Sequence, residues 1–421
     1  MTLESEINFL DLDVFAGGMP HEWFTWLRAN QPIYRHPVPD GSAFWVLSKY
    51  QDIVDVSRRP DLFSSDDMYG GPSGLTIAEQ QRMLTSAKGS KTLTHMDPPE
   101  HTIHRSLVEK RFRNQPIAAL EDRIREITGE LIDSSISKGI CDFVYDVAAV
   151  VPTTIIMELM GLPESDREMI LRLANANFAV DDPDFVADSN AYTVARDSFQ
   201  EYGRELANLR RLNPRDDVIS TLVESRIDGE PLSDQLIALF FEQFVAAGHE
   251  TTLTAISQGM NAFIENPQQW RALVDEPSLS ISATEEVLRW STPVTYMRRA
   301  VRQDMDFRGT KFSEGDSVTM WYISGNRDEE VFEDPFRFDI RRTPNNHIAF
   351  GGGGSHFCLG VRLARLETRI FFEELTKRVE DVESIGPPVP LRSNHFNAFK
   401  RLPVRFRGKG CPVLVETMDV Q

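Results

Sequence analysis

The stretch FGGGGSHFCLG, residues 350–360, decides the fold of this 421-residue chain. Glycines fill positions 351–354, and Cys358 precedes a segment, residues 361–379, whose pattern predicts a helix. Glycine allows backbone angles and close approaches that other residues resist. The N-terminal end of a helix stabilises a nearby negative charge. This arrangement favours a cysteine held as a thiolate on a tight loop.

This stretch has three other interpretations. A buried structural cysteine beside a glycine turn would be the simplest one for a lone cysteine. A phosphate-binding loop has less support, because no Gly-Lys-Ser/Thr follows the glycines. His356 is only two residues from Cys358, which is a poor position for the base of a cysteine nucleophile.

A second motif, Ala247-Gly248-His249-Glu250-Thr251-Thr252, lies inside an apolar run over residues 236–264 that predicts a long central helix. A threonine hydroxyl can replace a backbone hydrogen bond and open a helix locally. An acid beside that opening can relay protons. The alternative is a helix whose polar residues only face solvent. HExxH metalloprotease chemistry is excluded, because Leu253 stands where the second histidine is needed.

Two further motifs place charges on helices upstream of the cysteine. Glu286 and Arg289 are three residues apart, so a helix would bring them to one face as an ion pair. Pro98 and Pro99 predict a helix start, and the helix would direct His101 and Arg105 to the same side. Such a pair of cations can bind a carboxylate. Ordinary solvated charge is the alternative in both cases.

Composition restricts the class of protein. The net charge of −19 makes broad nucleic-acid binding a poor hypothesis. The cysteines are Cys141, Cys358 and Cys411, without a CxxC pair, which favours a reducing cytoplasm over disulfides or a zinc ribbon. The acidic N-terminus does not resemble a signal peptide. We found no run of about 18 apolar residues and expect no membrane span.

The organisation along the chain predicts one domain over residues 1–421 that is mainly α with a minor β portion. Strands are expected at 43–47 and 317–322, a loop at 69–74 and a surface turn at 180–188. Helices are expected to start at 163–166 and 231–234, and residues 100–290 are expected to be mostly helical.

Taken together, these motifs closely resemble those of the bacterial cytochromes P450, in the same order and over about residues 20 to 410. The resemblance implies the P450 fold, a long central helix over haem b (iron protoporphyrin IX), and Cys358 as the iron ligand. Phe350 lies one residue farther from the cysteine than in the commonest family pattern. The resemblance also implies a set of haem-binding residues: His101, Arg105, Ala247, Gly248, Arg299, Phe350, His356 and Gly360.

The resemblance further implies a monooxygenase that inserts one atom of O2 into a C–H bond, with Glu250 as the acid and Thr251 as the alcohol of proton delivery. Glu286, Arg289 and Arg342 would brace the core. Electrons would come from a separate ferredoxin and an NAD(P)H-dependent reductase. We expect a basic docking patch formed by Lys110, Arg111, Arg113, Arg362 and Arg365. A peroxide-using enzyme and a non-catalytic haem sensor are the alternatives.

The substrate is expected to be hydrophobic, because most candidate wall residues are apolar or aromatic. The nearest resemblance is to terpene- and steroid-hydroxylating members of the family. For any single wall residue, ordinary core packing is an equally good interpretation. The candidates are Met68, Tyr69, Phe178, Phe244, Val245, Ala247, Val294, Thr295, Met297, Phe396 and Asn397.

Overall fold

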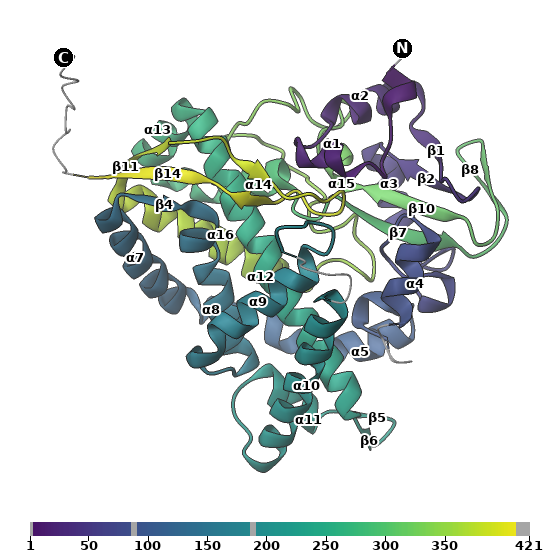
Figure 1. Cartoon of the computed structure of the whole chain (residues 1–421), viewed down its shortest axis with the longest axis horizontal. Helices are drawn as coiled ribbons and strands as arrows, with labels where there is room; N and C mark the ends of the chain where they lie inside the picture. The colour runs from purple at the N-terminus through teal and green to yellow at the C-terminus, as the bar shows by residue number, and fades with distance from the viewer. Residues whose placement is uncertain (1–2, 86–90, 186–190, 410–421) are drawn as a thin grey trace.

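Helices form most of the architecture and a five-stranded sheet lies beside them, in a computed structural model that describes residues 3–85, 91–185 and 191–409. Cys411 and residues 186–188 of the expected turn lie outside the described residues. The prediction of a mainly α fold with a minor β portion is confirmed (Figure 1). The helices are α1 (Leu12–Ala16), α2 (His21–Asn30), α3 (Tyr50–Ser57), α4 (Ile77–Thr85), α5 (Glu100–Glu109), α6 (Asn114–Ala118), α7 (Glu121–Lys138), α8 (Val150–Met160), α9 (Arg167–Phe178), α10 (Ala191–Leu212), α11 (Val218–Glu224), α12 (Asp234–Glu265), α13 (Pro267–Asp275), α14 (Ser280–Ser291), α15 (Tyr322–Gly325) and α16 (Val361–Arg378).

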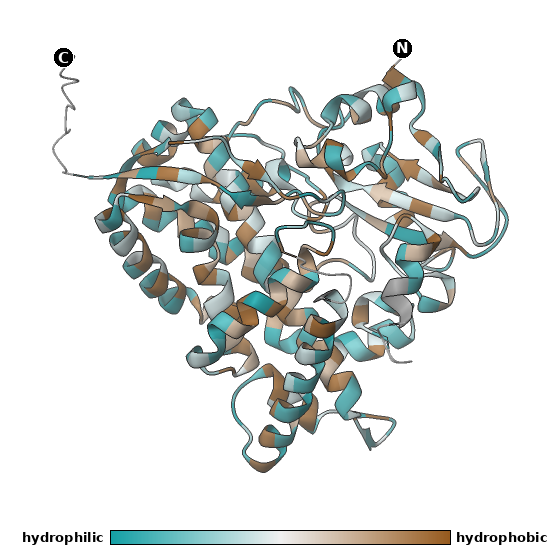
Figure 2. Cartoon of the chain, viewed as in Figure 1, coloured by the Kyte–Doolittle hydropathy of each residue, from teal (hydrophilic) through white to brown (hydrophobic). Residues whose placement is uncertain are grey.

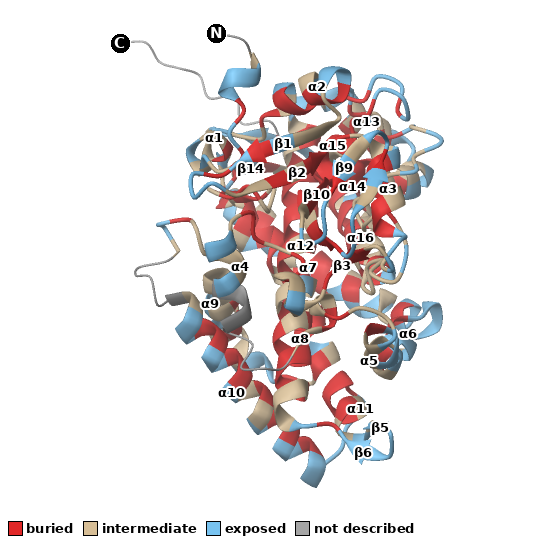
Figure 3. Cartoon of the chain, turned by 90° about the vertical axis from the view of Figure 1, so that its right-hand side faces the viewer, coloured by how far each residue is buried: buried red, intermediate tan, exposed pale blue. Residues whose placement is uncertain are grey.

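The central helix is α12, which begins where the sequence predicts. Its N-cap is Ser233, whose hydroxyl accepts a hydrogen bond from the backbone N–H of Leu236. Such a cap satisfies one of the free N–H groups at a helix start. The helix ends just before Pro267, which starts α13. Most of α12 is buried (Figure 3), so its packing stabilises the surrounding helices through the largest hydrophobic core.

The main sheet has the strand order β1-β2-β10-β7-β3, and β10 lies between a parallel and an antiparallel neighbour. Val318 of β10 is opposite Arg299 of β7, so the sheet fixes the position of that arginine. A second sheet has the order β11-β14-β4. The strands are β1 (Ile33–Pro37), β2 (Ala43–Leu47), β3 (Phe63–Ser64), β4 (Ile140–Asp142), β5 (Arg226–Ile227), β6 (Glu230–Pro231), β7 (Tyr296–Val301), β8 (Met305–Phe307), β9 (Thr310–Phe312), β10 (Ser317–Trp321), β11 (Val379–Ser384), β12 (Val389–Pro390), β13 (Phe399–Arg401) and β14 (Pro403–Gly408).

Most local predictions agree with these elements. The strand at 43–47 is β2, and the helix expected over 361–379 is α16. The helices carry both hydrophilic and hydrophobic residues (Figure 2), as expected where one side of a helix faces a core. The expected strand at 317–322 ends one residue early, because Tyr322 already begins α15.

The described part of the expected surface turn at 180–188 is a turn, and Pro183 and Asp184 are exposed. Within it, Asp182 is buried and accepts a hydrogen bond from the backbone N–H of Arg392.

The expectation that the chain contains no apolar run of about 18 residues needs a correction. Residues Phe143–Met160 form a stretch long and apolar enough to cross a membrane, with a mean hydropathy of 1.6. Of this stretch, 67% is buried inside the structure, as in the core helix of a folded protein. It runs from a π-helical turn, η5 (Phe143–Ala148), into α8.

Candidate active site

The cysteine loop folds back on itself ahead of α16. The backbone N–H of Cys358 donates to the carbonyl of Phe350 at 3.1 Å and closes the loop. Gly354 has a φ of +79°, and a Cβ at this position would lie 2.5 Å from the carbonyl oxygen of Ser57. Only glycine fits both the backbone angle and this close approach to the end of α3.

The sulfur of Cys358 lies at the start of α16 among hydrogen-bond donors. Burial raises the pKa of the Cys358 thiol, while hydrogen bonds from the backbone N–H groups of Gly360 and Val361 lower it. The charges of Arg105 and Arg365 act in the same lowering direction. This donor set suits an anionic sulfur, and a bound metal cation deprotonates a coordinating thiol.

Phe350 has polar neighbours on one side. The guanidinium of Arg365 lies 4.9 Å from the centre of its ring, and the His347 ring is 5.8 Å away. Arg365 also forms two hydrogen bonds of 2.7 Å with Glu285 of α14. The structure therefore joins Phe350 to α14 through a cation–π contact and an ion pair.

Four basic side chains that are far apart in the sequence meet near the cysteine loop. The rings of His101 and His356 are 4.2 Å apart, and the charges of Arg105 and Arg299 act on both. Burial, followed by these charges, lowers the pKa of His101 to about 4 and that of His356 to about 2. Arg299, only 5% exposed, donates to the Arg298 carbonyl and pairs with no carboxylate within the described part of the chain. A cluster of this kind calls for a bound anion.

Glu286 of α14, by contrast, has hydrogen-bond partners for both of its carboxylate oxygens. Glu286 accepts two hydrogen bonds of 2.8 Å from Arg289, and both side chains are completely buried. Arg342 donates to Glu286 at 3.2 Å, and Asn345 and the backbone N–H of Asp339 donate as well. The structure thus brings the three residues Glu286, Arg289 and Arg342 together as the sequence predicts.

The polar segment of α12 opens on one side only. Ala247 is exposed although it lies in the middle of a buried helix, and Thr251 donates to its carbonyl at 2.8 Å. Glu250 is 4% exposed. Gly248 faces α8, because a Cβ there would lie 2.9 Å from Ile156. The accessible positions in this segment are therefore those of Ala247 and Thr251.

The predicted wall residues divide into two groups. Phe178 and Phe396 stack with ring centres 3.8 Å apart, and Val294 pairs with Phe396 through an isolated β-bridge. Ala179, Leu391 and Ala398 pack with these rings in a separate small core. Tyr69 and Met297 are half-buried.

The other wall residues are not brought to this cluster. Met68 is 82% exposed, and Phe244 and Val245 belong to the main core. Thr295 is fully buried and donates to the Asn394 carbonyl, while Asn397 donates to the Ser291 carbonyl at 2.6 Å. The hydrogen bonds of Thr295 and Asn397 thus join the end of α14 and the segment after it to the turn at residues 394–397.

Sequence reasoning missed several residues beside the site. Arg298 fixes the loop at residues 69–71 by donating to the carbonyls of Tyr69 and Gly71. Glu367 of α16 is buried, which raises its pKa to about 8, and it lies against Thr252. Thr153 of α8 contacts His249. No local motif marks these residues, because each gains its position from packing between distant elements.

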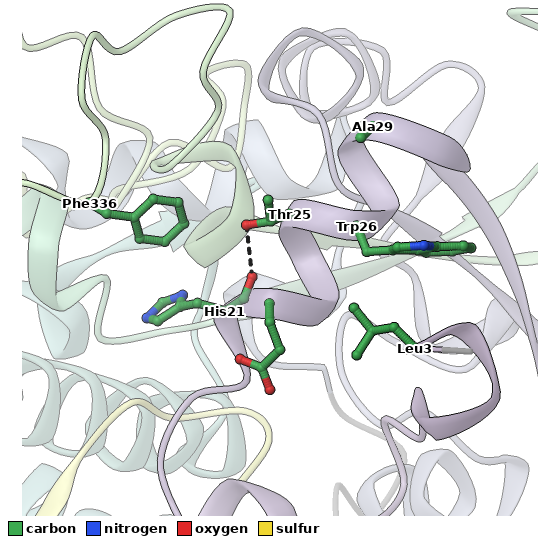
Figure 4. Close-up of a pocket in the computed structure, with 7 residues that line it drawn as sticks. Leu3, His21, Thr25, Trp26, Ala29 and Phe336 are labelled. Carbon is green, nitrogen blue, oxygen red and sulfur yellow. Dashed lines mark hydrogen bonds between the residues drawn. The ribbon is translucent and has the colours of Figure 1, made fainter. Parts of the chain in front are cut away.

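A shallow surface pocket lies on other elements (Figure 4). Figure 4 shows the hydrogen bond from the Thr25 hydroxyl to the His21 carbonyl, 3.1 Å long, on one side of it. No predicted site residue lines this pocket, which is formed by Leu3, His21, Glu22, Thr25, Trp26, Ala29 and Phe336.

The fold and this site define a haem-thiolate class of protein, and comparison with known proteins agrees. A sequence profile described as Cytochrome P450 matches residues 8–380. The chain belongs to this family. It is a monooxygenase with haem b as its cofactor.

Its relatives include a lipid hydroxylase and a steroid monooxygenase. A methyl-branched lipid omega-hydroxylase of Mycobacterium tuberculosis is 39% identical over 405 residues, which are 94% of this chain and 92% of that protein. A steroid C26-monooxygenase of Mycolicibacterium smegmatis is 35% identical, over 97% of this chain and 95% of that one. A Mycobacterium marinum cytochrome P450 solved with pseudoionone superposes with a TM-score of 0.87 at 33% identity, covering 93% and 97% of the two chains.

The residues present fit a haem. Buried polar atoms without a partner, His101 Nδ1 and His356 Nε2, lie in the cluster with Arg105 and Arg299. Carboxylates of the size of haem propionates would neutralise this buried positive charge. The charge of Arg105 also acts on Cys358, so the anion-binding cluster and the sulfur belong to one site.

Proposed function

We propose that this chain hydroxylates an aliphatic C–H bond of a large hydrophobic molecule, a terpenoid, steroid or methyl-branched lipid, with O2 as oxidant. The observation that carries the proposal is the pairing of a donor-surrounded Cys358 with an accessible Thr251 on the central helix. The activities of the relatives, on a methyl-branched lipid and on a steroid, support this substrate class.

Cys358 would ligate the iron through its thiolate, and His101, Arg105, Arg299 and His356 would hold the propionates. Haem bound to an anionic sulfur supplies O2 activation and favours O–O cleavage. The hydrogen bonds from Gly360 and Val361 would hold the sulfur in its anionic form.

Glu250 and Thr251 would deliver protons. The Thr251 hydroxyl lies at the accessible side of α12, and turning it away from the Ala247 carbonyl frees it to donate toward that space. Glu250 is the adjacent buried acid. This pair favours O2 over peroxide as the oxidant, because peroxide brings its own protons. The hydroxylase activities of the relatives favour catalysis over a sensor function.

The stacked pair Phe178 and Phe396, with Val294 beside it, would form an aromatic wall for the substrate. Aromatic rings suit aliphatic ring systems and branched chains because they bury a large apolar area. Met68, Phe244, Val245, Thr295 and Asn397 are placed less favourably, for the reasons of exposure, core packing and hydrogen bonding given above.

Electrons would come from a ferredoxin with its NAD(P)H-dependent reductase, docking on a basic patch. Of its expected members, Arg111 is paired with Asp216 and Arg365 with Glu285. Lys110, Arg113 and Arg362 are exposed and form no ion pair within the described residues, which leaves them as the centre of the patch. A location in the cytoplasm, and the single domain, remain predictions.

The test is a screen of steroids, terpenoids and methyl-branched fatty acids for a low-to-high spin shift, followed by product analysis with NADH, ferredoxin and reductase. A hydroxylated product from one of these classes supports the proposal, and turnover of none of them overturns the substrate class. Cys358→Ser is expected to lose the carbon-monoxide difference band that names the family. A variant that keeps the band would refute the ligand assignment.

Proton delivery is tested separately with Thr251→Ala. We expect this variant to consume NADH but to release most of the reducing equivalents as peroxide instead of product. Full coupling of NADH oxidation to product in this variant would remove the role of Thr251.

A further inference from the structure

Glu250 differs from two other buried acids, Glu242 and Glu286, in its partner. Glu242, which lies upstream on the same helix α12, pairs with Arg196 at 3.1 Å, and Glu286 pairs with Arg289. Glu250 pairs with neither lysine nor arginine among the residues that the structure describes. The group nearest to its carboxylate is a histidine: His249 Nε2 lies 3.3 Å from Glu250 Oε1.

The other ring nitrogen of His249 is held by α8. His249 Nδ1 lies 2.8 Å from the hydroxyl oxygen of Thr153, and His249 is 1% exposed. The helices approach closely here because Gly248 has no Cβ: a methyl group at that position would lie 2.9 Å from Ile156, one turn along α8 from Thr153. The contact therefore depends on a close approach of two helices at residues 153–156 and 248–249.

The hydrogen bonds of Thr153 decide the tautomer of the imidazole. The Thr153 hydroxyl is 2.5 Å from the Ala149 carbonyl oxygen, a distance that requires the hydroxyl hydrogen to lie between these two oxygens. A hydroxyl has one hydrogen, so Thr153 can only accept from His249. His249 must then carry a hydrogen on Nδ1, and in the neutral ring Nε2 is left with a lone pair.

That nitrogen lies 3.3 Å from Oε1 of Glu250. Two bare acceptors at 3.3 Å repel each other in a buried site, whereas a proton between them satisfies both. Nε2 and Oε1 are both buried and have no hydrogen-bond partner in the structure. We infer that His249, oriented by Thr153, is a positioning residue that keeps a proton on the His249–Glu250 pair, so that Glu250 can donate it toward Thr251.

This inference deepens the proposed function and rests on it, because it assumes that Glu250 delivers protons. The proton transfers in this scheme balance. One proton leaves Oε1 of Glu250 toward the Thr251 side, and one proton from water returns to the pair, while Nδ1 keeps its hydrogen throughout. His249 does not reach the reacting atoms in this scheme. It offers the carboxyl group of Glu250 a hydrogen-bond acceptor.

The tautomer is measured by 15N–1H NMR of histidine-labelled holoenzyme in its diamagnetic ferrous carbon-monoxide form, with His249→Gln to assign the signals. We expect a hydrogen on Nδ1 of His249. Thr153→Val removes the acceptor at nearly unchanged volume and is expected to move the hydrogen to Nε2. Thr153→Ser is expected to restore the wild-type signal. A wild-type protein with hydrogen on Nε2 alone, or a Thr153→Val variant that still carries hydrogen on Nδ1, would overturn the inference.

Thr154→Val is the matched control, because the Thr154 hydroxyl donates only to the Val150 carbonyl, at 2.8 Å. It should leave both the tautomer and the yield of product per NADH unchanged. Thr153→Val should lower that yield by about two- to tenfold, the effect of one lost neutral hydrogen bond. A Thr153→Val variant with a shifted tautomer and full yield would refute the positioning role.

A different variant tests the proposed function. Glu250→Gln with full coupling would remove Glu250 from proton delivery, while the NMR result would still report whether Thr153 sets the tautomer. The two failures are therefore distinguishable.

Discussion

Two groups of buried charge flank the same active site and differ in how they are satisfied. Around Glu286, the buried acid has internal partners: Arg289 and Arg342 both bind its carboxylate. Around His101 and His356, Arg105 and Arg299 form no ion pair within the described residues, and Arg299 donates only to a carbonyl. The first group braces the protein by itself. The second is complete only with an anionic ligand, which distinguishes a structural cluster from a binding cluster by chemistry rather than by burial.

This comparison is tested most severely by Glu286→Gln. The change leaves Arg289 and Arg342 buried without a counter-charge, so we expect the free energy of unfolding to fall by about 3–5 kcal/mol. Chemical denaturation of the holoenzyme measures it. Glu285→Gln is the matched control: its side chain is 25% exposed, so a smaller loss is expected. Equal losses in the two variants would contradict the claim that Glu286 stabilises the fold more than Glu285 does.

Arg342→Gln should have an intermediate effect. It removes one donor from Glu286, while Arg289 keeps its two bonds of 2.8 Å. We expect a loss of about 1.5–3 kcal/mol, the range for a hydrogen bond to a charged group. A loss as large as that of Glu286→Gln would mean that the pair of Glu286 and Arg289 cannot support the core alone.

Arg299→Gln is expected to act on haem retention instead of folding. It removes a buried cation that has no carboxylate partner among the described residues, so the free energy of unfolding of the haem-free protein should stay unchanged or rise. The variant should lose about 1.4 kcal/mol of haem-binding free energy, which corresponds to a factor of ten. Haem transfer to excess apomyoglobin should therefore be about tenfold faster.

Arg298→Gln provides the contrast to Arg299→Gln, since these neighbours on β7 have opposite environments. Arg298 donates to the carbonyls of Tyr69 and Gly71 and to the Ser317 hydroxyl. Its loss should destabilise the fold in the haem-free and haem-bound protein alike. If Arg299→Gln released haem no faster than Arg298→Gln, the assignment of the second cluster to an anion would be wrong.

The smallest effect is expected at the surface. Replacing Lys110, Arg113 and Arg362 together by glutamine should slow reduction by an acidic ferredoxin by a few-fold and flatten its dependence on salt. Stopped-flow reduction at several ionic strengths measures both. Arg35→Gln, on the exposed side of β1, is the control and should change neither. Salt-independent reduction of the unmodified enzyme would count against the patch.

Much of this site could be predicted from the sequence because its motifs are local. The glycine run before Cys358, the spacing of Glu286 and Arg289, and the AGHETT segment each encode their geometry within one loop or one helix turn. The long apolar run likewise predicted α12 almost to the residue. The wall residues were predicted less well: Met68 is exposed, and Thr295 and Asn397 hold a turn. Their roles depend on segments that are far apart in the chain.

The sequence by itself therefore determined the family, the place of Cys358 after the glycine run and the order of the motifs, because these depend on neighbours within a few residues. Only the tertiary structure decided which charges find partners. It joined Thr153 to His249 across two helices, paired Phe178 with Phe396, and gave adjacent Arg298 and Arg299 opposite surroundings. The physical reason is that the energy of a buried polar group depends on what packs against it, and no spacing within one segment of the chain records that.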